Sequence, residues 1–152
     1  KNFILRNNSE FSASPYLYVD ENYKDLRLIN FPKKNIRKND LLWRNPIGNS
    51  TVIVSRSLIL KAGGYSTLKK RNDYATWMRI LKLHKCHYCK NIKNVKILRR
   101  KSSLTSKKYS LIIYQYLAYR ESGKNRIVSI LLTIYSVING MKNVITKYIT
   151  FK

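Results

Sequence analysis

Acidic residues are scarce in this chain of 152 residues, which carries 7 Asp and Glu against 31 Lys and Arg. The formal net charge of +24 indicates an anionic partner, which could be nucleic acid, an acidic membrane surface or a phosphorylated substrate. The charge does not choose among these three. Lys, Asn, Ile and Tyr are all abundant and have codons rich in A and T, so genomic drift is an alternative source of part of the basicity. Among so few acids, Asp73 is the only carboxylate between Leu41 and Arg120.

Cysteine is scarce as well. Cys86 and Cys89 are too close in sequence to connect distant parts of a fold, and a disulfide framework needs more cysteines, which indicates a reducing compartment such as the cytoplasm. Together with His84 and His87 they offer four metal ligands, but a structural zinc site normally uses two separated pairs and the sequence has no further Cys or His. A zinc site is therefore the less favoured alternative. We expect these residues at a helix-to-strand turn, with the cysteines partly buried as small hydrophobic side chains.

A membrane-spanning run of apolar residues is also missing. The uncharged stretch Ile127–Met141 is shorter than the ~20 residues that a span requires. It belongs to a predicted basic, amphipathic helix over residues 125–148. The apolar stripe of this helix comprises Ile127, Ile130, Leu131, Ile134, Ile138, Met141, Ile145 and Tyr148, with Lys142, Lys147 and Lys152 elsewhere or beyond its end. Two alternatives stay open: the stripe packs against the domain or a partner helix, or it lies in the interface of a membrane.

The length and composition are those of one ordinary domain, because 44% hydrophobic residues and 12 Tyr can bury a core. The chain begins with Lys1 rather than Met, and its first apolar stretch is too short for a signal peptide. We therefore expect it to be a piece of a longer protein.

An α/β order is predicted, with strands over 16–19, 49–54 and 95–98 and helices over 57–61, from 73 onward, over 109–120 and over 125–148. The segment 49–54 is β-branched and follows Gly48, which is typical of a buried strand. Ser57 is expected to cap the first helix. Gly63 and Gly64 are expected to end it, because glycine readily adopts the left-handed conformation found at helix C-termini.

The helix beginning near Asp73 shows the clearest periodicity. Its apolar residues recur at spacings of three and four and predict one buried face, formed by Tyr74, Trp77, Ile80 and Leu81. Asn72 or Asp73 stands at the expected N-cap. A break at Gly123 separates the two C-terminal helices.

Four motifs follow one another between Trp43 and Ser106. They are Arg44-Asn45-Pro46-Ile47-Gly48-Asn49-Ser50-Thr51-Val52, then Ala62-Gly63-Gly64-Tyr65, then Asn72-Asp73-Tyr74 with Trp77 and Arg79, and finally Arg100 with Ser103-Leu104-Thr105-Ser106. This ordered set, over about 20–106, resembles the second half of a bacterial family 2 glycosyltransferase. The strongest part is Asp-Tyr-x-x-Trp-x-Arg after Gly-Gly-Tyr.

The resemblance implies the C-terminal, acceptor-side half of a GT-A fold, an α/β nucleotide-binding sandwich. Residues 1–106 would form this partial GT-A domain and residues 107–152 an amphipathic helical extension. The implied reaction is an inverting transfer of a sugar from a nucleotide-sugar donor to a surface polysaccharide, of capsule or O-antigen type. The acceptor would be lipid-linked or a saccharide, and the protein peripheral at the cytoplasmic face of the cell membrane, where its basic surface suits anionic lipid.

By the same resemblance, Asp73 would be the general base toward the acceptor hydroxyl. A helix N-terminus near Lys69, Lys70 and Arg71 independently favours the ionised carboxylate that a base requires. The alternative is that Asp73 only caps its helix, and both roles can coexist.

The other residues that the resemblance assigns to substrate binding are Asn49, Gly63, Gly64, Asn72, Trp77, Arg79, Arg100 and Ser103. Trp77 and Arg79 would form the wall near the acceptor and diphosphate, or Trp77 would be plain core. Gly63 and Gly64 would let backbone approach the donor sugar. Arg100 and Ser103 would belong to a loop that closes over the sugar, or Arg100 would be a solvated cation.

Three departures from the family pattern limit the resemblance. Asn72 replaces the usual Glu and Asn49 a frequent His, so acceptor contacts are altered or lost. No Asp-x-Asp occurs in the chain. In the family this motif holds Mg²⁺ or Mn²⁺ against the donor diphosphate and lies in the first half of the domain. The isolated chain is therefore not expected to be a competent enzyme.

Two alternatives accompany this interpretation. A basic nucleic-acid-binding module would use Lys, Arg and interleaved Tyr, but the sequence has no recognisable nucleic-acid motif and nucleic acid is not favoured. An inactive remnant of a glycosyltransferase would keep the ancestry without the activity.

Overall fold

The predicted mixed α/β order is confirmed by the computed structural model, which describes residues 9–43, 45–92, 95–99 and 108–149, with backbone alone at 108 and 141–149. The strands are β1 (Phe11–Ala13), β2 (Tyr16–Val19), β3 (Asp25–Ile29), β4 (Asn35–Ile36), β5 (Ile53–Val54), β6 (Cys86–Tyr88) and β7 (Val95–Leu98). The helices are α2 (Lys38–Trp43), the 3₁₀-helix η1 (Asn49–Thr51), α3 (Arg56–Lys61), α4 (Asn72–Leu83), α5 (Lys108–Glu121) and α6 (Arg126–Ile149).

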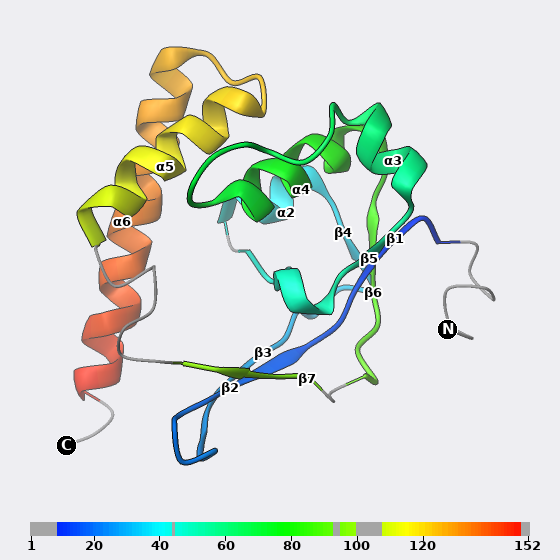
Figure 1. Cartoon of the computed structure of the whole chain (residues 1–152). Helices are drawn as coiled ribbons and strands as arrows, with labels where there is room; N and C mark the ends of the chain where they lie inside the picture. The colour runs from blue at the N-terminus through cyan, green and yellow to red at the C-terminus, as the bar shows by residue number, and fades with distance from the viewer. Residues whose placement is uncertain (1–8, 44, 93–94, 100–107, 150–152) are drawn as a thin grey trace.

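Seven short strands form two sheets in the described residues. The first sheet has the order β4-β6-β1-β5, in which β1 pairs parallel with β6 and antiparallel with β5. The second has the order β3-β2-β7 and contains the predicted strands 16–19 and 95–98, paired in parallel. Only Ser14 and Pro15 separate β1 from β2, so the two sheets share one continuous segment of chain (Figure 1).

Helix α4 covers one face of the first sheet (Figure 1). All four residues of its predicted apolar face are buried, which confirms that prediction. The ring of Trp77 lies 5.5 Å from that of Phe11 on β1. Helices α2 and α3 contact α4, and α5 packs against it through Tyr74 and Tyr119, whose rings meet edge to face at 5.9 Å. The core thus holds α4 between the sheet and the C-terminal helices.

The predicted buried strand over 49–54 is wrong in its first half. Residues Asn49–Thr51 form η1, because the Gly48 carbonyl accepts hydrogen bonds from both the backbone N–H and the hydroxyl of Thr51, at 2.9 and 2.8 Å. Only Ile53 and Val54 pair as β5, and Ile53 is 57% exposed at the edge of the sheet. The β-branched composition is therefore satisfied by a short edge strand rather than a buried one.

Two predicted helix caps shift by one or two positions. Ser55, not Ser57, caps α3, and its hydroxyl accepts the Leu58 N–H at 3.2 Å. Neither Asn72 nor Asp73 is the N-cap of α4: that position is Arg71, which adopts a left-handed conformation with φ 61°.

The predicted C-terminus of α3 is confirmed. Gly63 and Gly64 have φ +85° and +76°, and their N–H groups bond back to the carbonyls of Leu60 and Ile59 at 3.0 and 2.9 Å. These two bonds are those of the Schellman motif, in which a left-handed residue, here Gly63, follows the helix.

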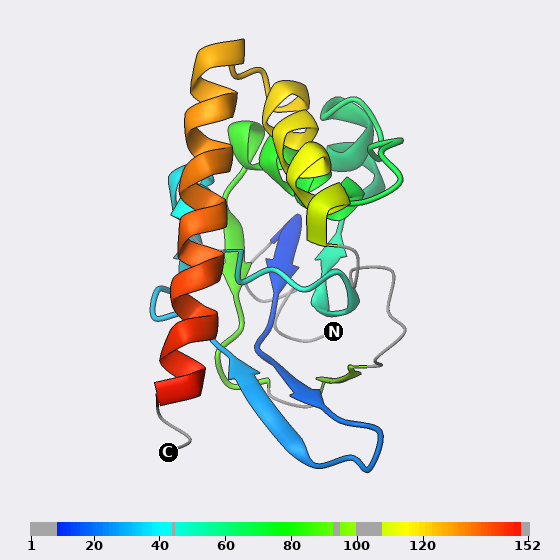
Figure 2. The ribbon, with the colours of Figure 1, turned by 90° about the vertical axis from the view of Figure 1, so that its left-hand side faces the viewer.

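The two C-terminal helices form a hairpin that turns at Gly123, whose φ is +79°, and Figure 2 shows α6 running the height of the molecule beside α5. Packing of the apolar stripe of α6 against the domain is wrong within the described part of the chain, whereas packing against a partner helix stays a prediction. The members of the stripe from Ile127 to Ile138 are 46–71% exposed, while Ser129 and Thr133 face inward and are buried. Met141, Ile145 and Tyr148 have no described side chains. None of the described helices is long and apolar enough to cross a membrane.

Candidate functional site

Asp73 lies in the first turn of α4, half-buried. Its Oδ1 accepts the N–H of Tyr74 at 2.7 Å, and its own N–H donates to Oδ1 of Asn72 at 2.8 Å. Among the described residues, the second carboxylate oxygen of Asp73 accepts no hydrogen bond. One oxygen is thus held by the helix backbone, and the other is available to a ligand.

Two tyrosines lie within the electrostatic reach of this carboxylate. Burial raises the pKa of the Tyr65 hydroxyl, and the nearby negative charge of Asp73 raises it further. Burial also raises the pKa of Tyr16, with additional contributions from Tyr18, Tyr88 and Asp73. Both phenols therefore lie within the electrostatic reach of Asp73 and stay protonated, so they are hydrogen-bond donors at neutral pH.

The Tyr65 hydroxyl binds a second predicted residue, Asn49. It donates to Oδ1 of Asn49 at 2.8 Å, although 16 residues separate the two in sequence. We call Asp73, Tyr65, Asn49 and Tyr16 the Asp73 cluster. Because Oδ1 of Asn49 is occupied, the NH₂ group of the same amide is the part left to donate to a ligand.

Local sequence explains how the cluster is positioned. A Cβ at Gly48 would lie 2.7 Å from a ring carbon of Tyr16, so only glycine lets the backbone before Asn49 approach that ring. Tyr65 follows the left-handed turn at Gly64, and its ring meets Trp77 edge to face at 5.9 Å. The α3–α4 turn and the start of η1 thus meet at the N-terminus of α4.

Trp77 is 2% exposed and belongs to the core, as in the alternative interpretation. Its indole contacts the ring of Tyr65 edge to face and so helps to hold that member of the Asp73 cluster in place. The side-chain oxygen of Asn72 accepts a hydrogen bond from the N–H of Asp73. The backbone carbonyl of Asn72 accepts one from the Thr76 hydroxyl at 2.8 Å.

Arg79 and the two glycines form a separate group. The Nη2 atom of Arg79 donates to the Gly64 carbonyl at 2.7 Å, and its Nη1 lies 3.8 Å from Oε2 of Glu121 at the end of α5. The guanidinium group thereby joins the α3–α4 turn to the C-terminal helices. Gly63 lies next to it, since a Cβ there would be 3.9 Å from Nη1. Arg100 and Ser103 lie outside the described residues.

The His84–Cys89 run is split between two elements. His84 ends α4, and Cys86 and His87 belong to β6, which confirms a helix-to-strand turn. Cys86 and Cys89 are buried free thiols, and burial raises both pKa values, so they are not activated nucleophiles. In the described ranges, no three His, Cys, Asp or Glu side chains lie together as metal ligands. The thiols and imidazoles of this run are not the oxygen ligands that Mg²⁺ prefers, so the run does not suit the metal that the resemblance implies.

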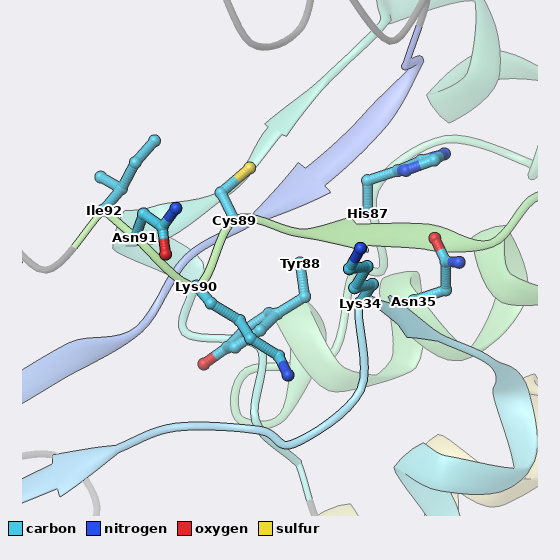
Figure 3. A pocket seen from close by; sticks show the side chains of 8 residues that line it. All are labelled: Lys34, Asn35, His87, Tyr88, Cys89, Lys90, Asn91 and Ile92. Atoms are coloured by element: carbon cyan, nitrogen blue, oxygen red, sulfur yellow. The ribbon is translucent and has the colours of Figure 1, made fainter.

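A pocket of about 490 Å³ lies elsewhere, at the end of β6 (Figure 3). It is lined by Lys34, Asn35, His87, Tyr88, Cys89, Lys90, Asn91 and Ile92, and by none of the predicted site residues. The ammonium group of Lys90 donates a hydrogen bond to the Pro32 carbonyl. Burial, together with the charge of Lys85 and with His84, lowers the pKa of His87, so this side chain is neutral at pH 7. A smaller pocket of about 220 Å³ adjoins the residues after Asn49 and is lined partly by Ser12, Ser14, Ser50 and Thr51.

The chain is similar to a glycosyltransferase. Over 129 residues it is 24% identical to the O-antigen biosynthesis glycosyltransferase WbnJ of Escherichia coli. The match covers 84% of this chain and 51% of that relative, so the chain spans about half the length of the relative. No protein-family model matches the chain, and no solved structure matches it. The likeness indicates a distant glycosyltransferase relationship and does not specify family 2, the donor or the acceptor.

Sequence reasoning missed Tyr65, Tyr16 and Glu121 as members of these two groups. Tyr65 belongs to the Gly-Gly-Tyr motif and Glu121 is one of two carboxylates after residue 41, so the sequence carries a signal at both positions. Tyr16 carried none, because only the fold brings it to Gly48.

Proposed function

We propose that this chain is the acceptor-side part of an inverting family 2 glycosyltransferase with a GT-A fold, incomplete by itself. In this proposal residues 1–106 form the partial GT-A domain and residues 107–152 the helical extension. The donor is a nucleotide-sugar, and the acceptor is a lipid-linked or free saccharide of O-antigen or capsule type. The protein works at the cytoplasmic face of the cell membrane, as a peripheral protein.

One observation carries the proposal: among the described residues the second carboxylate oxygen of Asp73 accepts no hydrogen bond, and the carboxylate lies within electrostatic reach of Tyr65, whose hydroxyl binds Asn49. As the acceptor hydroxyl attacks the anomeric carbon, Asp73 takes the hydroxyl proton. The bond from that carbon to the donor diphosphate breaks on the opposite face, and the diphosphate leaves with the bonding electron pair. Attack and departure on opposite faces invert the anomeric configuration.

The other predicted residues have supporting roles. The amide NH₂ of Asn49, oriented by Tyr65, donates to a substrate hydroxyl, while Asn72 holds the backbone of Asp73. Gly64 offers its backbone to the donor sugar, in line with the absence of any described atom within 4 Å of a Cβ built there. Arg79 has an indirect role: its guanidinium group donates a hydrogen bond to the Gly64 carbonyl and fixes the backbone of that turn. Arg100 and Ser103 belong to the closing loop of the same proposal.

No residue of this chain is assigned as a ligand of the metal ion in the complete enzyme. Mg²⁺ or Mn²⁺ would stabilise the diphosphate leaving group, with ligands from residues beyond this chain. Every role given to the present residues is binding, orientation or proton transfer.

The test is Asp73→Asn in the full-length protein that contains this chain. Removing a general base should lower sugar transfer by at least about 100-fold and leave donor binding unchanged, because asparagine keeps the shape and loses the proton acceptor. Turnover is measured with radiolabelled nucleotide-sugar and donor affinity by calorimetry.

Asp25→Asn is the matched control. This carboxylate is on β3, and its only described ion pair is an exposed one with Lys96, so turnover should be unchanged. Wild-type turnover in Asp73→Asn would remove Asp73 from the base role.

A further inference from the structure

The outward side of α6 is apolar over three turns. We define the α6 outer face as Ile127, Ile130, Leu131, Ile134 and Ile138, which are 71, 49, 60, 51 and 46% exposed. At 100° per residue these five positions fall within about a third of the helix circumference. The buried residues on the other side are small and polar, and the Thr133 hydroxyl donates to the Ser129 carbonyl at 2.7 Å. The helix therefore packs through Ser129, Thr133 and the partly buried Leu132, and leaves the five aliphatic residues of the α6 outer face uncovered.

A contiguous apolar face of this kind marks an interaction surface. Its charged surroundings select the partner. Among the described side chains of α5, α6 and the turn between them, the cations are Arg120, Lys124 and Arg126, and the one acid, Glu121, already faces Arg79. Arg120 and Arg126 are exposed at the turn where α6 begins. A second copy of the chain would bring a net charge of +24 against +24, so self-association through this face is electrostatically disfavoured.

An anionic bilayer offers both of the properties that this face requires, namely an apolar interior and a negative surface. A nucleic acid would satisfy the charge and leave the aliphatic side chains in water. From Ile127 to Ile138 the helix rises about 17 Å, less than the ~30 Å of a hydrocarbon core, so the fit is in the plane of the interface.

Trp43 adds an interfacial side chain at the edge of this face. It lies on α2 and is 62% exposed, although its ring stacks edge to face on Tyr135 of α6 at 4.9 Å. Tryptophan is enriched where apolar and aqueous phases meet, because its indole is apolar with one polar N–H.

We propose that the α6 outer face, with Trp43 at its edge, binds an anionic lipid bilayer with α6 lying in the interfacial plane. The proposal deepens the peripheral location given above, and it is independent of glycosyl transfer because its test contains no donor and no acceptor.

The test measures sedimentation of the full chain with phosphatidylcholine vesicles, with and without phosphatidylglycerol. Leu131→Glu should weaken binding to the anionic vesicles by at least about 10-fold, because it removes a leucine from the interface and places a charge there. Leu60→Glu is the matched control on α3: the same substitution, with the same charge change, at a residue that is 62% exposed. It should change binding by less than about twofold.

Fluorescence gives a second readout that needs no substitution in α6. The chain has two tryptophans, and Trp77 is buried, so a change on binding reports Trp43. Emission should shift to shorter wavelength with anionic vesicles and be quenched by brominated lipid. Trp43→Phe should show neither effect. If Leu131→Glu failed to fold by circular dichroism, this wild-type signal would decide.

Four results would each overturn the proposal. They are equal binding by Leu131→Glu and Leu60→Glu, binding without any change at Trp43, a dimer in sedimentation velocity that Leu131→Glu dissociates, and tight duplex DNA binding with no vesicle association. The third would assign the face to a second copy and the fourth to nucleic acid.

Discussion

At the scale of single residues, Tyr65 is the side chain that joins the Asp73 cluster. Its hydroxyl orients Asn49 and its ring rests on Trp77. We expect Tyr65→Phe to reduce sugar transfer by the full-length protein by about 10-fold, because the Asn49 amide loses its fixed orientation. The stability cost should be under about 1 kcal/mol, since the Asn49–Tyr65 bond is exposed and water replaces it. Turnover and urea unfolding measure the two effects.

Tyr109→Phe is the matched control, because Tyr109 is 88% exposed on α5. It should change neither quantity. If Tyr65→Phe lost stability and activity in proportion, Tyr65 would be a packing residue and the orientation role would be wrong.

The residue scale also shows what sequence can predict. The isolation of Asp73 among cations points to it in the sequence, and the structure puts it within electrostatic reach of Tyr65, which binds Asn49. Its predicted N-cap position failed because Arg71 adopts positive φ, a conformation that a non-glycine residue takes only when its surroundings impose it. The Arg79–Glu121 pair was missed because such long-range contacts leave no trace in local spacing.

At the scale of elements, the α3–α4 turn depends on two left-handed glycines. At Gly64 a Cβ would meet nothing within 4 Å, so Gly64→Ala tests the backbone conformation alone. We expect a loss of about 1 kcal/mol in the free energy of unfolding, because alanine is strained at φ +76°. Urea denaturation measures it.

Gly140→Ala is the opposite case. Gly140 lies within α6 and also has open space around its Cα, but it is helical, so alanine should stabilise by up to about 1 kcal/mol. Equal effects at the two positions would show that the left-handed turn does not limit stability.

Element prediction succeeded where the apolar period was long. The apolar spacing of α4 and α6 repeats over three or more turns and predicts both helices, whereas 49–54 is too short for its β-branched residues to separate a strand from η1 followed by β5. For α6 the pattern predicted which residues share a face. It could not predict that this face stays exposed, because that depends on whether elements from elsewhere in the chain pack against it.

At the scale of the whole molecule, sequence order predicted the α/β class but not the pairing of the strands. Sheet neighbours such as β1 and β6 lie more than 70 residues apart, and each is only 3 residues long, so no local pattern specifies their register.

The net charge of +24 gives the last prediction, which concerns the stability of the whole fold. The ion pairs found among the described side chains are Lys33–Asp40, Arg79–Glu121 and Lys96–Asp25, so most cations have no acid beside them. Self-repulsion should therefore exceed attraction, and salt should screen it. Between about 20 and 300 mM sodium chloride we expect Tm to rise by at least about 3 °C, equivalent to about 1 kcal/mol. Differential scanning calorimetry of the full chain measures the change.

Sodium acetate at equal ionic strength should match sodium chloride, because screening depends on ionic strength and specific anion binding does not. A Tm that stayed flat or fell with salt would mean that the three ion pairs outweigh the repulsion, and that the basic surface is a weaker electrostatic attractor than its formal charge indicates.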